Sequence, residues 1–319
     1  MKYFIITIDT EGDNLWNWKP GQKIHTNNTL YLQRFQNVCN RYAFKPVWLT
    51  NYEMIMDSRY VEFIQSVVAS NSGELGMHLH AWNSPPEHEL PITNQEASYL
   101  IEYPFEIMES KISFLTSTIL SRTGIRPITH RAGRWAMNDS YYELLAKHGY
   151  KVDCSVTPNI DWSTHPGMTK ESAGSNYSDY SEQPYVVTTR HGKILEVPMT
   201  IRNCHHLFIN QNGSFRSYFS GVYHAFVGKK IWLRPMGYNL SEMLYLLDAV
   251  YETDSDYIMF MLHSSEFMPG GSPSFKDEKS IELLYKDINT LFEKASDKYK
   301  GITLADYHSM VNPSKEDLQ

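Results

Sequence analysis

Short apolar segments alternate with helical patterns along nearly the whole chain, and this alternation constrains the fold more than any other feature of the sequence. The strand-like segments are residues 3–9, 45–50, 74–80, 126–132, 150–156, 193–199, 257–263 and 301–307, and the helical patterns between them are 30–42, 61–69, 97–120, 140–148, 241–251 and 279–295. Because successive βα units build a parallel sheet covered by helices, this order predicts an α/β protein. About seven such units suit a closed or nearly closed (β/α) barrel better than an open doubly wound sheet.

The composition is that of a globular chain with a substantial core. The 319 residues are 42% hydrophobic, which is enough to build one large domain. We therefore expect a single barrel domain over residues 1–319, with a long irregular loop around residues 157–190 that is rich in Ser, Thr, Asn and Tyr. The net charge of −7 includes no basic stripe, so nucleic acid is not an expected partner.

Cysteine usage and hydropathy indicate the compartment. Cys39, Cys154 and Cys204 are odd in number and form no C-x-x-C pair, which favours ordinary core thiols in a reducing environment. Acidic residues directly follow the first apolar segment, which therefore has the pattern of a β-strand and not of a signal peptide. No segment approaches the roughly 18 to 20 apolar residues of a membrane span. We expect a cytoplasmic protein without a membrane span, and no sequence feature specifies an oligomeric state.

Polar residues mark the ends of the predicted strands. They are Asp9 and Glu11 after the first strand, His78 and His80 in the third, His130 and Arg131 in the fourth, Asp153 in the fifth and His263 in the last long one. Turn and helix-cap chemistry explains any one of these residues, but it explains the whole set poorly. Because active sites of (β/α) barrels form where strands end and the following loops begin, these residues predict a cleft at that end of the barrel.

Two of these pairs suggest a metal site. Residues i and i+2 of a strand point the same way, so His78 shares a face with His80, and Asp9 shares a face with Glu11. If both faces meet in the barrel mouth, two imidazoles and a carboxylate form a ligand set for Zn²⁺ or a similar divalent ion, with positions left open for water or substrate. A hydrogen-bonded core position is the ordinary explanation of a lone histidine, but it is weaker for two histidines that face two acids.

Four segments, in this order, resemble a known family. They are TIDTEGD (7–13), ELGMHLHAW (74–82), HRAGRW (130–135) and MLHSSEF (261–267). Together they resemble divergent NodB-type polysaccharide deacetylases, also called carbohydrate esterase family 4, and most of all the members found among lipopolysaccharide and capsule genes. The resemblance runs from about residue 2 to residue 307. It implies a distorted (β/α)₇ barrel and metal-dependent hydrolysis of N-acetyl groups on sugars or glycoconjugates.

The same resemblance implies roles for the acidic residues of the first segment. Asp9 matches the aspartate that serves the family as general base. Thr10 stands where the family has a second aspartate that binds the metal. Glu11 is then the expected replacement ligand, because it shares the face of Asp9, and metal binding by Asp9 itself stays open as an alternative.

The histidine motif of the family is also altered. The usual pattern is His-x-x-x-His, with both histidines binding the metal. His78 matches the first of them, but Trp82 occupies the second position. His80 is therefore the expected second histidine ligand.

The remaining segments imply the rest of a catalytic site. By resemblance, Arg131 pairs with the catalytic aspartate and holds it ionised, and His263 is the general acid that protonates the leaving amine. Trp135 matches part of the groove wall, and we expect Trp82 beside it to contact substrate. Asp153 is a further expected substrate-binding residue, with a structural role as an equal alternative.

Two other functions remain open at this stage. The replacements at Thr10 and Trp82 leave open a metal-free C–N hydrolase that keeps the barrel and acts on a small amide such as a ureide. Tryptophans in the predicted loops also suit a non-catalytic carbohydrate-binding protein, because their faces stack on sugar rings; they are Trp16, Trp18, Trp82, Trp135 and Trp162. No G-x-S-x-G or P-loop motif is present, so the sequence supports neither a serine hydrolase nor a nucleoside-triphosphatase.

Overall fold

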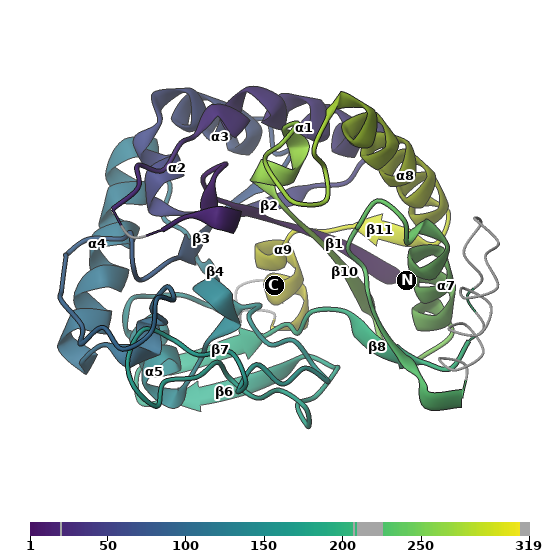
Figure 1. Ribbon diagram of the computed structural model, residues 1–319. Coiled ribbons are helices and arrows are strands. Elements are labelled where there is room, and N and C mark those ends of the chain that lie inside the picture. Colours follow the sequence, from purple (N-terminus) through teal and green to yellow (C-terminus); the bar gives the residue numbers. More distant parts are fainter. Residues whose placement is uncertain (20, 207, 209–225, 313–319) are drawn as a thin grey trace, which may run out of the picture.

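The computed structural model describes residues 1–19, 21–206, 208 and 226–312. A curled sheet of nine strands forms its centre (Figure 1). The strands are β1 (Lys2–Thr10), β2 (Pro46–Thr50), β3 (Glu74–Leu79), β4 (Thr129–Ala132), β5 (Val152–Asp153), β6 (Tyr185–Thr189), β7 (Gly192–Glu196), β10 (Tyr257–His263) and β11 (Tyr299–Gly301). Their order is β10-β1-β2-β3-β4-β5-β7-β6, with β11 also paired to β1, and β6 is the one antiparallel strand in it. A separate hairpin pairs β8 (Ile201–Cys204) with β9 (Lys229–Trp232).

Helices follow the strands and cover the outer side of the sheet (Figure 1). They are α1 (Leu32–Arg41), α2 (Tyr52–Met56), α3 (Ser58–Ala69), α4 (Phe105–Thr123), α5 (Asp139–Lys147), α7 (Leu240–Tyr251) and α8 (Glu278–Ser296). The last helix, α9 (Leu304–Val311), lies on the inner side of the curl instead. Short 3₁₀ turns lie at η1 (Leu15–Asn17), η2 (Asn27–Tyr31), η3 (Leu100–Glu102), η4 (Gly133–Trp135) and η5 (Ser264–Phe267). Local signals explain several helix ends: the Asn138 side chain accepts a hydrogen bond at the start of α5, and Gly124 takes a left-handed conformation after α4.

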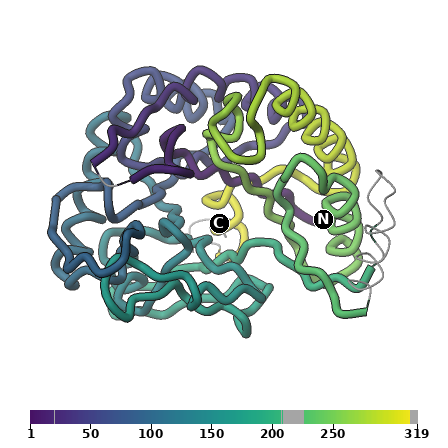
Figure 2. Tube along the Cα trace, in the orientation of Figure 1, coloured from purple at the N-terminus to yellow at the C-terminus, as the bar shows by residue number. Residues whose placement is uncertain are grey.

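The chain returns to its starting strand at the end of its path. Figure 2 shows the last part of the chain, in green and yellow, beside the purple first strand. β1 pairs in parallel with β10 over seven register positions, from Tyr3↔Tyr257 to Asp9↔His263. Residues more than 250 positions apart in the sequence, such as Asp9 and His263, are thereby fixed side by side.

Strand alternation divides the core into two parts. Inward-facing side chains form a small cluster inside the curl, which includes Ile5, Leu49, Val152, Leu195, Met259 and Met261. Outward-facing residues of the same strands pack against the helices, among them Phe4, Ile6, Ile8, Trp48, Met77 and Phe260. Because the interior of the curl is filled by side chains, the polar residues at the strand ends lie above a solid apolar floor.

The sheet is curled and the ring of strands is incomplete, which matches the predicted distorted (β/α)₇ barrel. No strand pairing among the described residues joins β7 to β10. The segment after β7 bridges this opening with single hydrogen bonds, from Tyr257 Oη to Pro198 O (2.5 Å) and from Met259 N to Thr200 Oγ1 (2.8 Å). The α/β prediction is therefore confirmed, and of the closed and nearly closed barrels that the sequence allowed, the structure is the partly open one.

Two sequence-based expectations are wrong in detail. Residues 301–307 are not a strand: β11 ends at Gly301, and Leu304 begins α9, whose start is capped by the Thr303 side chain. Leu304 and Tyr307 of α9 then join the interior cluster of the barrel. The segment 157–190 is irregular as expected up to residue 184, but β6 lies within it and pairs with β7. None of the helices in the described part of the chain combines the length and the apolar character needed to cross a membrane.

Candidate active site

Four of the candidate residues lie in one layer at the carboxyl end of the sheet. Asp9 of β1 is in register with His263 of β10, and His78 of β3 is in register with Arg131 of β4. Each of these strands has its apolar neighbours, such as Ile8, on the helix-covered face. The functional side chains consequently converge on the inner side of the curl, where the sequence pattern predicted a cleft.

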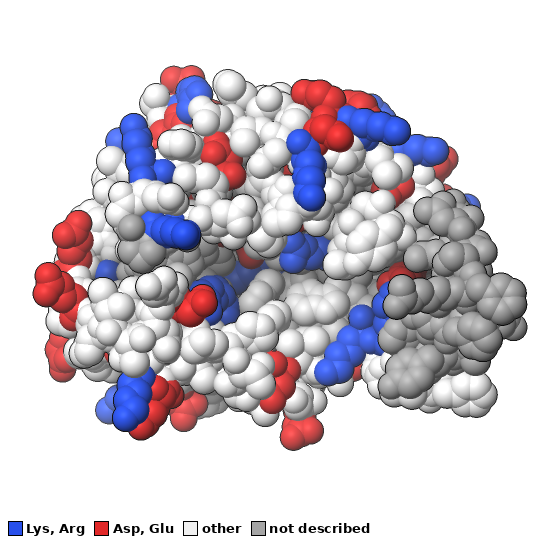
Figure 3. Space-filling model, in the orientation of Figure 1, with Lys and Arg blue, Asp and Glu red and all other residues white. Residues whose placement is uncertain are grey.

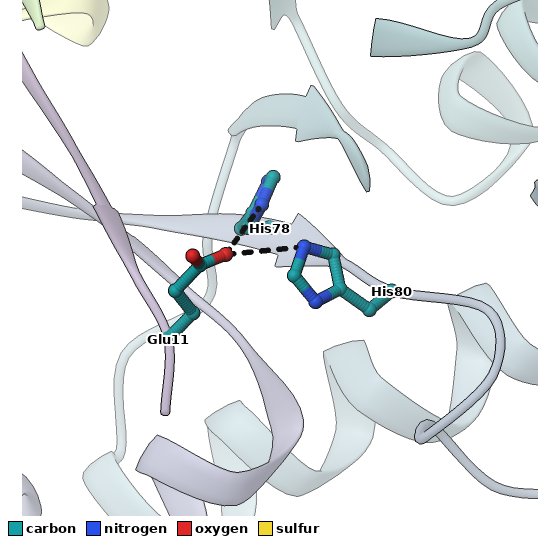
Figure 4. Close-up of side chains that lie close together, drawn as sticks. All are labelled: Glu11, His78 and His80. Atoms are coloured by element: carbon teal, nitrogen blue, oxygen red, sulfur yellow. Dashed lines mark ion pairs between the residues drawn. The ribbon is translucent and has the colours of Figure 1, made fainter. Parts of the chain in front are cut away.

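Glu11, His78 and His80 form a compact group of potential metal ligands. One nitrogen or oxygen of each lies within 4.8 Å of the others, and all three residues are buried. Figure 4 shows the side chains pointing toward one another, Glu11 from the end of β1 and the two histidines from β3 and the residue after it. Glu11 Oε2 lies 3.2 Å from His80 Nε2 and 3.6 Å from His78 Nε2. In the described part of the chain this is the one such group of three His, Cys, Asp or Glu residues.

The donor set of this group fits a divalent cation. Two imidazole nitrogens and one carboxylate oxygen are the protein ligands of many catalytic zinc sites, which keep a fourth position open. His78 Nδ1 lies 3.0 Å from the backbone oxygen of Arg131, so its Nε2 is the nitrogen that faces the group. Such a second hydrogen bond fixes the ring of a metal-binding histidine and selects the tautomer that can coordinate.

The protonation states of Glu11 and His80 support the same conclusion. Burial alone would raise the pKa of Glu11, but the neighbouring His263, His78 and His80 hold it well below its usual range. Burial and the charge of His78 lower the pKa of His80 to about 4, so His80 is a neutral imidazole near pH 7. An ionised carboxylate and a neutral imidazole are the protonation states in which these side chains bind a metal. For His78, burial lowers the pKa, but the Asp9 and Glu11 carboxylates outweigh it and raise that pKa, which favours the protonated ring, so metal binding there has to displace a proton.

Asp9 and Arg131 form a buried ion pair beside this group. Arg131 Nη1 donates to Asp9 Oδ1 at 2.6 Å, and the guanidinium also donates to Thr7 Oγ1 (2.9 Å) and to the backbone oxygen of Cys154 (3.1 Å). Burial by itself would raise the pKa of Asp9, but the Arg131 guanidinium, together with His78 and His263, brings it below its usual value. Asp9 is therefore ionised at neutral pH, with Oδ2 left free of the guanidinium.

His263 completes the polar layer from β10, the strand next to β1. Its Nε2 lies 3.8 Å from Asp9 Oδ2 and 3.9 Å from Glu11 Oε1, so this nitrogen is directed into the site. On the other side of the ring, Nδ1 lies 3.3 Å from Glu266 Oε2 and 3.3 Å from an Arg234 guanidinium nitrogen. Glu266 also accepts a hydrogen bond from the His263 backbone N–H at 2.9 Å, which ties the side chain to the start of η5.

The backbone of Glu11 is held by residues from two distant segments. Its N–H donates to Ser264 Oγ at 3.0 Å, and its carbonyl oxygen accepts from Ser264 Oγ (2.9 Å) and from Asn28 Nδ2 (2.7 Å). Asn28 and Ser264 are both fully buried. The carboxylate of Glu11 is thus presented from a fixed turn, although Glu11 lies beyond the end of β1.

These residues surround an open cavity of about 340 Å³. Its lining consists of Asp9, Glu11, Leu15, Trp16, Trp18, His78, His80, Trp82, Gln95, Glu96, Ala97, Ala132, Arg134, Trp135 and His263. The face drawn in Figure 3 is hollowed near its centre, with Lys and Arg side chains along the hollow. Trp82 and Trp135 both line the cavity, where we expected substrate contacts, whereas Trp162 does not and instead donates to Thr157 Oγ1 at 2.8 Å.

Asp153 lies apart from the cavity. It is fully buried in register with His130, whose Nδ1 is 2.6 Å from Asp153 Oδ1. His130 precedes Arg131 on β4, so the two side chains point to opposite faces of the sheet, and Asp153 lies with His130 on the outer face under α5. Of the two roles considered for Asp153, its position favours the structural one.

Sequence reasoning missed several residues that support the site. Arg234 follows β9 and contacts both His263 and Glu266, but an isolated arginine in a loop carries no recognisable pattern. Asn28 likewise gives no sequence signal, because its partner Glu11 is close only through the tertiary fold. Glu266 was not missed: three residues after His263 it is predicted from the sequence to cap or line the loop, and it does cap the start of η5.

Comparison with known proteins finds solved structures with a similar fold. No protein-family model matches the sequence. No curated protein matches it either. A protein from Mycobacterium smegmatis assigned as a polysaccharide deacetylase is 14% identical, with 98% of this chain and 91% of that chain covered and a TM-score of 0.55. A second protein assigned as a polysaccharide deacetylase, from Pseudomonas aeruginosa, is 13% identical over 99% of this chain and 92% of that chain, with a TM-score of 0.53.

The chain has the polysaccharide deacetylase fold. This confirms the predicted NodB-like (β/α)₇ fold over nearly the whole chain. A 4-α-glucanotransferase from Thermococcus litoralis shares the fold as well, at 12% identity and a TM-score of 0.51, with 97% of this chain and 38% of that chain covered. Because one fold accommodates different reactions, the activity has to be argued from the site.

Proposed function

We propose that the protein is a metal-dependent hydrolase that removes an N-acetyl group from a sugar or glycoconjugate. The single observation that carries this proposal is the grouping of Glu11, His78 and His80 within 4.8 Å of one another, beside the Asp9–Arg131 ion pair. A ligand set, a base and an acid then face one cavity of about 340 Å³ on a deacetylase fold.

In this proposal, Glu11, His78 and His80 hold the divalent ion, and Zn²⁺ suits their nitrogen and oxygen donors best. The chemistry that such an ion supplies when bound is polarisation of the acetyl carbonyl and acidification of a water molecule. Oδ1 of Asp9 is engaged by Arg131, so the free Oδ2 is the atom that takes a proton from the attacking water. Arg131 keeps Asp9 in the ionised form that this step requires.

His263 is the proposed general acid. Its Nε2 faces the cavity, and its protonated Nδ1 donates to Glu266, so the ring presents one nitrogen to a bound substrate. Breakage of the C–N bond leaves an amine that needs a proton, and His263 Nε2 donates it. The products are acetate and the free amino sugar.

Trp82 and Trp135 are proposed to contact the sugar. Both line the cavity with large apolar faces, and the Arg131 guanidinium carbon lies 5.0 Å from the ring centre of Trp135. A cytoplasmic location, expected from the sequence, would favour a sugar nucleotide, a lipid-linked intermediate or a small glycoconjugate as the acetylated substrate. The chain is proposed to form one domain.

The test is acetate release from a panel of N-acetylated sugars, sugar nucleotides and oligosaccharides, with and without a chelator. We expect release by the wild type, loss with the chelator, and recovery when Zn²⁺ is restored. Asp9→Asn is expected to abolish release, whereas the matched substitution Asp254→Asn at an exposed turn leaves it unchanged. Release that persists in the chelator supports a metal-free hydrolase, and equal release by Asp9→Asn and wild type contradicts the catalytic proposal.

A further inference from the structure

The two histidines of the proposed metal centre are held in different ways. His78 has a hydrogen bond on the nitrogen that faces away from Glu11, at 3.0 Å from the Arg131 backbone oxygen. The corresponding atom of His80, Nδ1, is buried and has no hydrogen-bond partner among the described residues. A metal-binding histidine normally uses that nitrogen to fix its ring through a carboxylate, a carbonyl or a water. Another contact therefore has to orient the ring of His80.

Trp82 supplies such a contact on one face of the ring. The two ring centres are 4.1 Å apart and the planes differ by 20°, which is a stacked arrangement. Stacked aromatic pairs contribute about 0.5–1.5 kcal/mol beyond the area they bury. The stack leaves His80 Nε2 directed toward Glu11 Oε2, at 3.2 Å.

The backbone of Gly133 leaves no space beside the Cδ2 edge of the His80 ring. A Cβ atom at this position would lie 2.6 Å from His80 Cδ2 and 2.6 Å from the Leu79 backbone oxygen, so no larger residue fits without moving the histidine. Gly133 begins the η4 turn that follows β4, which places it beside the end of β3. The ring of His80 is thus in contact with an indole face and closely approached by a glycine backbone.

We propose that Trp82 and Gly133 are positioning residues that orient His80 for metal binding, in place of the missing hydrogen bond at Nδ1. The inference rests on the proposed metal centre of Glu11, His78 and His80. It also explains the residue pattern of the third strand. Trp82 stands at the position of the second ligand histidine in the family's motif. In this protein the residue at that position stacks on the ring of His80 instead of binding the metal itself.

The test compares the Zn²⁺ affinity of metal-free wild type with that of four variants, by competition with a chromophoric chelator. Trp82→Ala is expected to weaken binding about 10- to 100-fold, the range found when groups that orient a metal ligand are removed. Trp82→Phe keeps a flat ring on His80 and is expected to retain most of the affinity. Gly133→Ala is expected to weaken binding because its Cβ displaces His80.

Trp18→Ala is the matched control. Trp18 lines the same cavity and pairs with Trp82, with ring centres 6.4 Å apart, but in the described part of the chain it is Trp82, and not Trp18, that stacks on His80. We expect this variant to bind Zn²⁺ as the wild type does. Thermal unfolding of the metal-free proteins shows whether a variant has lost affinity because it has lost its fold. If Trp82→Ala is unfolded, the Zn²⁺ affinities of Trp82→Phe and Gly133→Ala test the positioning role in its place.

The outcomes separate this inference from the proposed function. Wild-type affinity in both Trp82→Ala and Gly133→Ala overturns the positioning role while leaving the metal centre intact. Equal losses of Zn²⁺ affinity in Trp82→Ala and Trp18→Ala overturn it as well, because removing any tryptophan of the cavity would then weaken binding. A wild type that binds no Zn²⁺ overturns the metal centre itself, and the inference with it.

Discussion

Arg131 Nη1 lies 2.6 Å from Asp9 Oδ1, and both side chains are shielded from solvent in the interior of the barrel. Removal of one member of such a buried pair leaves an uncompensated charge, which costs about 3–5 kcal/mol. We predict that Arg131→Met lowers the free energy of unfolding by about that amount. Urea denaturation of the variant and the wild type measures it.

The double variant Asp9→Asn/Arg131→Met is the control for this prediction. It carries neither charge, so we expect it to be more stable than Arg131→Met alone, although both lack the ion pair. A double variant that is less stable than Arg131→Met would contradict this prediction, because it would show that the Asp9 carboxylate stabilises the fold without its guanidinium, through His78 and His263.

The second prediction concerns His263. If it is an acid and not a ligand, His263→Gln lowers the rate of acetate release by about 100- to 10,000-fold, the usual contribution of a general acid. Zn²⁺ affinity should stay within about threefold of wild type, whereas a lost ligand costs far more. His191→Gln, at an exposed turn, should change neither quantity. A large loss of Zn²⁺ affinity in His263→Gln would assign His263 to the metal.

The third prediction concerns the buried carboxyl groups under α5. Burial, and then the charge of Asp153, raise the pKa of Glu196 well above its usual range, whereas the bond to His130 outweighs burial and keeps the pKa of Asp153 low. The protonated form of Glu196 is thus favoured. Glu196→Gln should change the free energy of unfolding by less than about 1 kcal/mol, because it replaces a neutral group by a neutral group of the same shape.

Asp153→Asn is the contrasting change in the same network. It removes the anion that faces His130 at 2.6 Å, and we expect it to cost about 1–3 kcal/mol. Denaturation at pH 7 gives both values. Equal costs for the two variants would contradict the assignment of the proton to Glu196.

Much of this arrangement is predictable from the sequence, and particular residues show why. Period-two alternation places Asp9, His78 and His263 on inner faces, because each follows an apolar neighbour that has to face the helices. The same rule, applied to the adjacent pair His130 and Arg131, separates them onto opposite faces. The rule also predicts that Asp153 lies outside the cleft, but only once Asp153 is known to pair in register with His130.

Contacts that depend on loop conformation were not predictable in this way. Trp82 follows the end of β3, where alternation no longer constrains the side chain, so its stack on His80 appears only in the folded chain. The β6–β7 hairpin escaped detection because β6 alternates between half-buried and exposed residues and lacks an apolar face. Residues 301–307 were misassigned because Leu304 and Tyr307 suit either a strand or a short capped helix.

The fourth prediction is a pH dependence that arises far from the active site. Glu74 begins β3, and its burial raises its pKa from the usual 4.5 to about 7. The folded state then binds more protons than the unfolded state between these values, so this residue makes stability fall as pH rises from 4.5 through 7. The loss amounts to about 3 kcal/mol at most.

Glu74→Gln removes this contribution, because the amide does not titrate and still accepts the hydrogen bond from the Ala305 N–H. The difference in unfolding free energy between the variant and the wild type should therefore grow in favour of the variant from pH 4.5 to pH 8. Denaturation curves across this range measure it, and a difference that is constant with pH would contradict a raised pKa at Glu74.

Anomalous diffraction at the zinc absorption edge, from crystals of the protein grown with Zn²⁺, tests the metal centre most directly. We predict one peak at about 2.0–2.2 Å from a Glu11 carboxylate oxygen, His78 Nε2 and His80 Nε2. Crystals of His80→Ala, measured in the same way, should lack it. The absence of a peak in the wild type, or a peak bonded to other residues, would contradict the proposed centre.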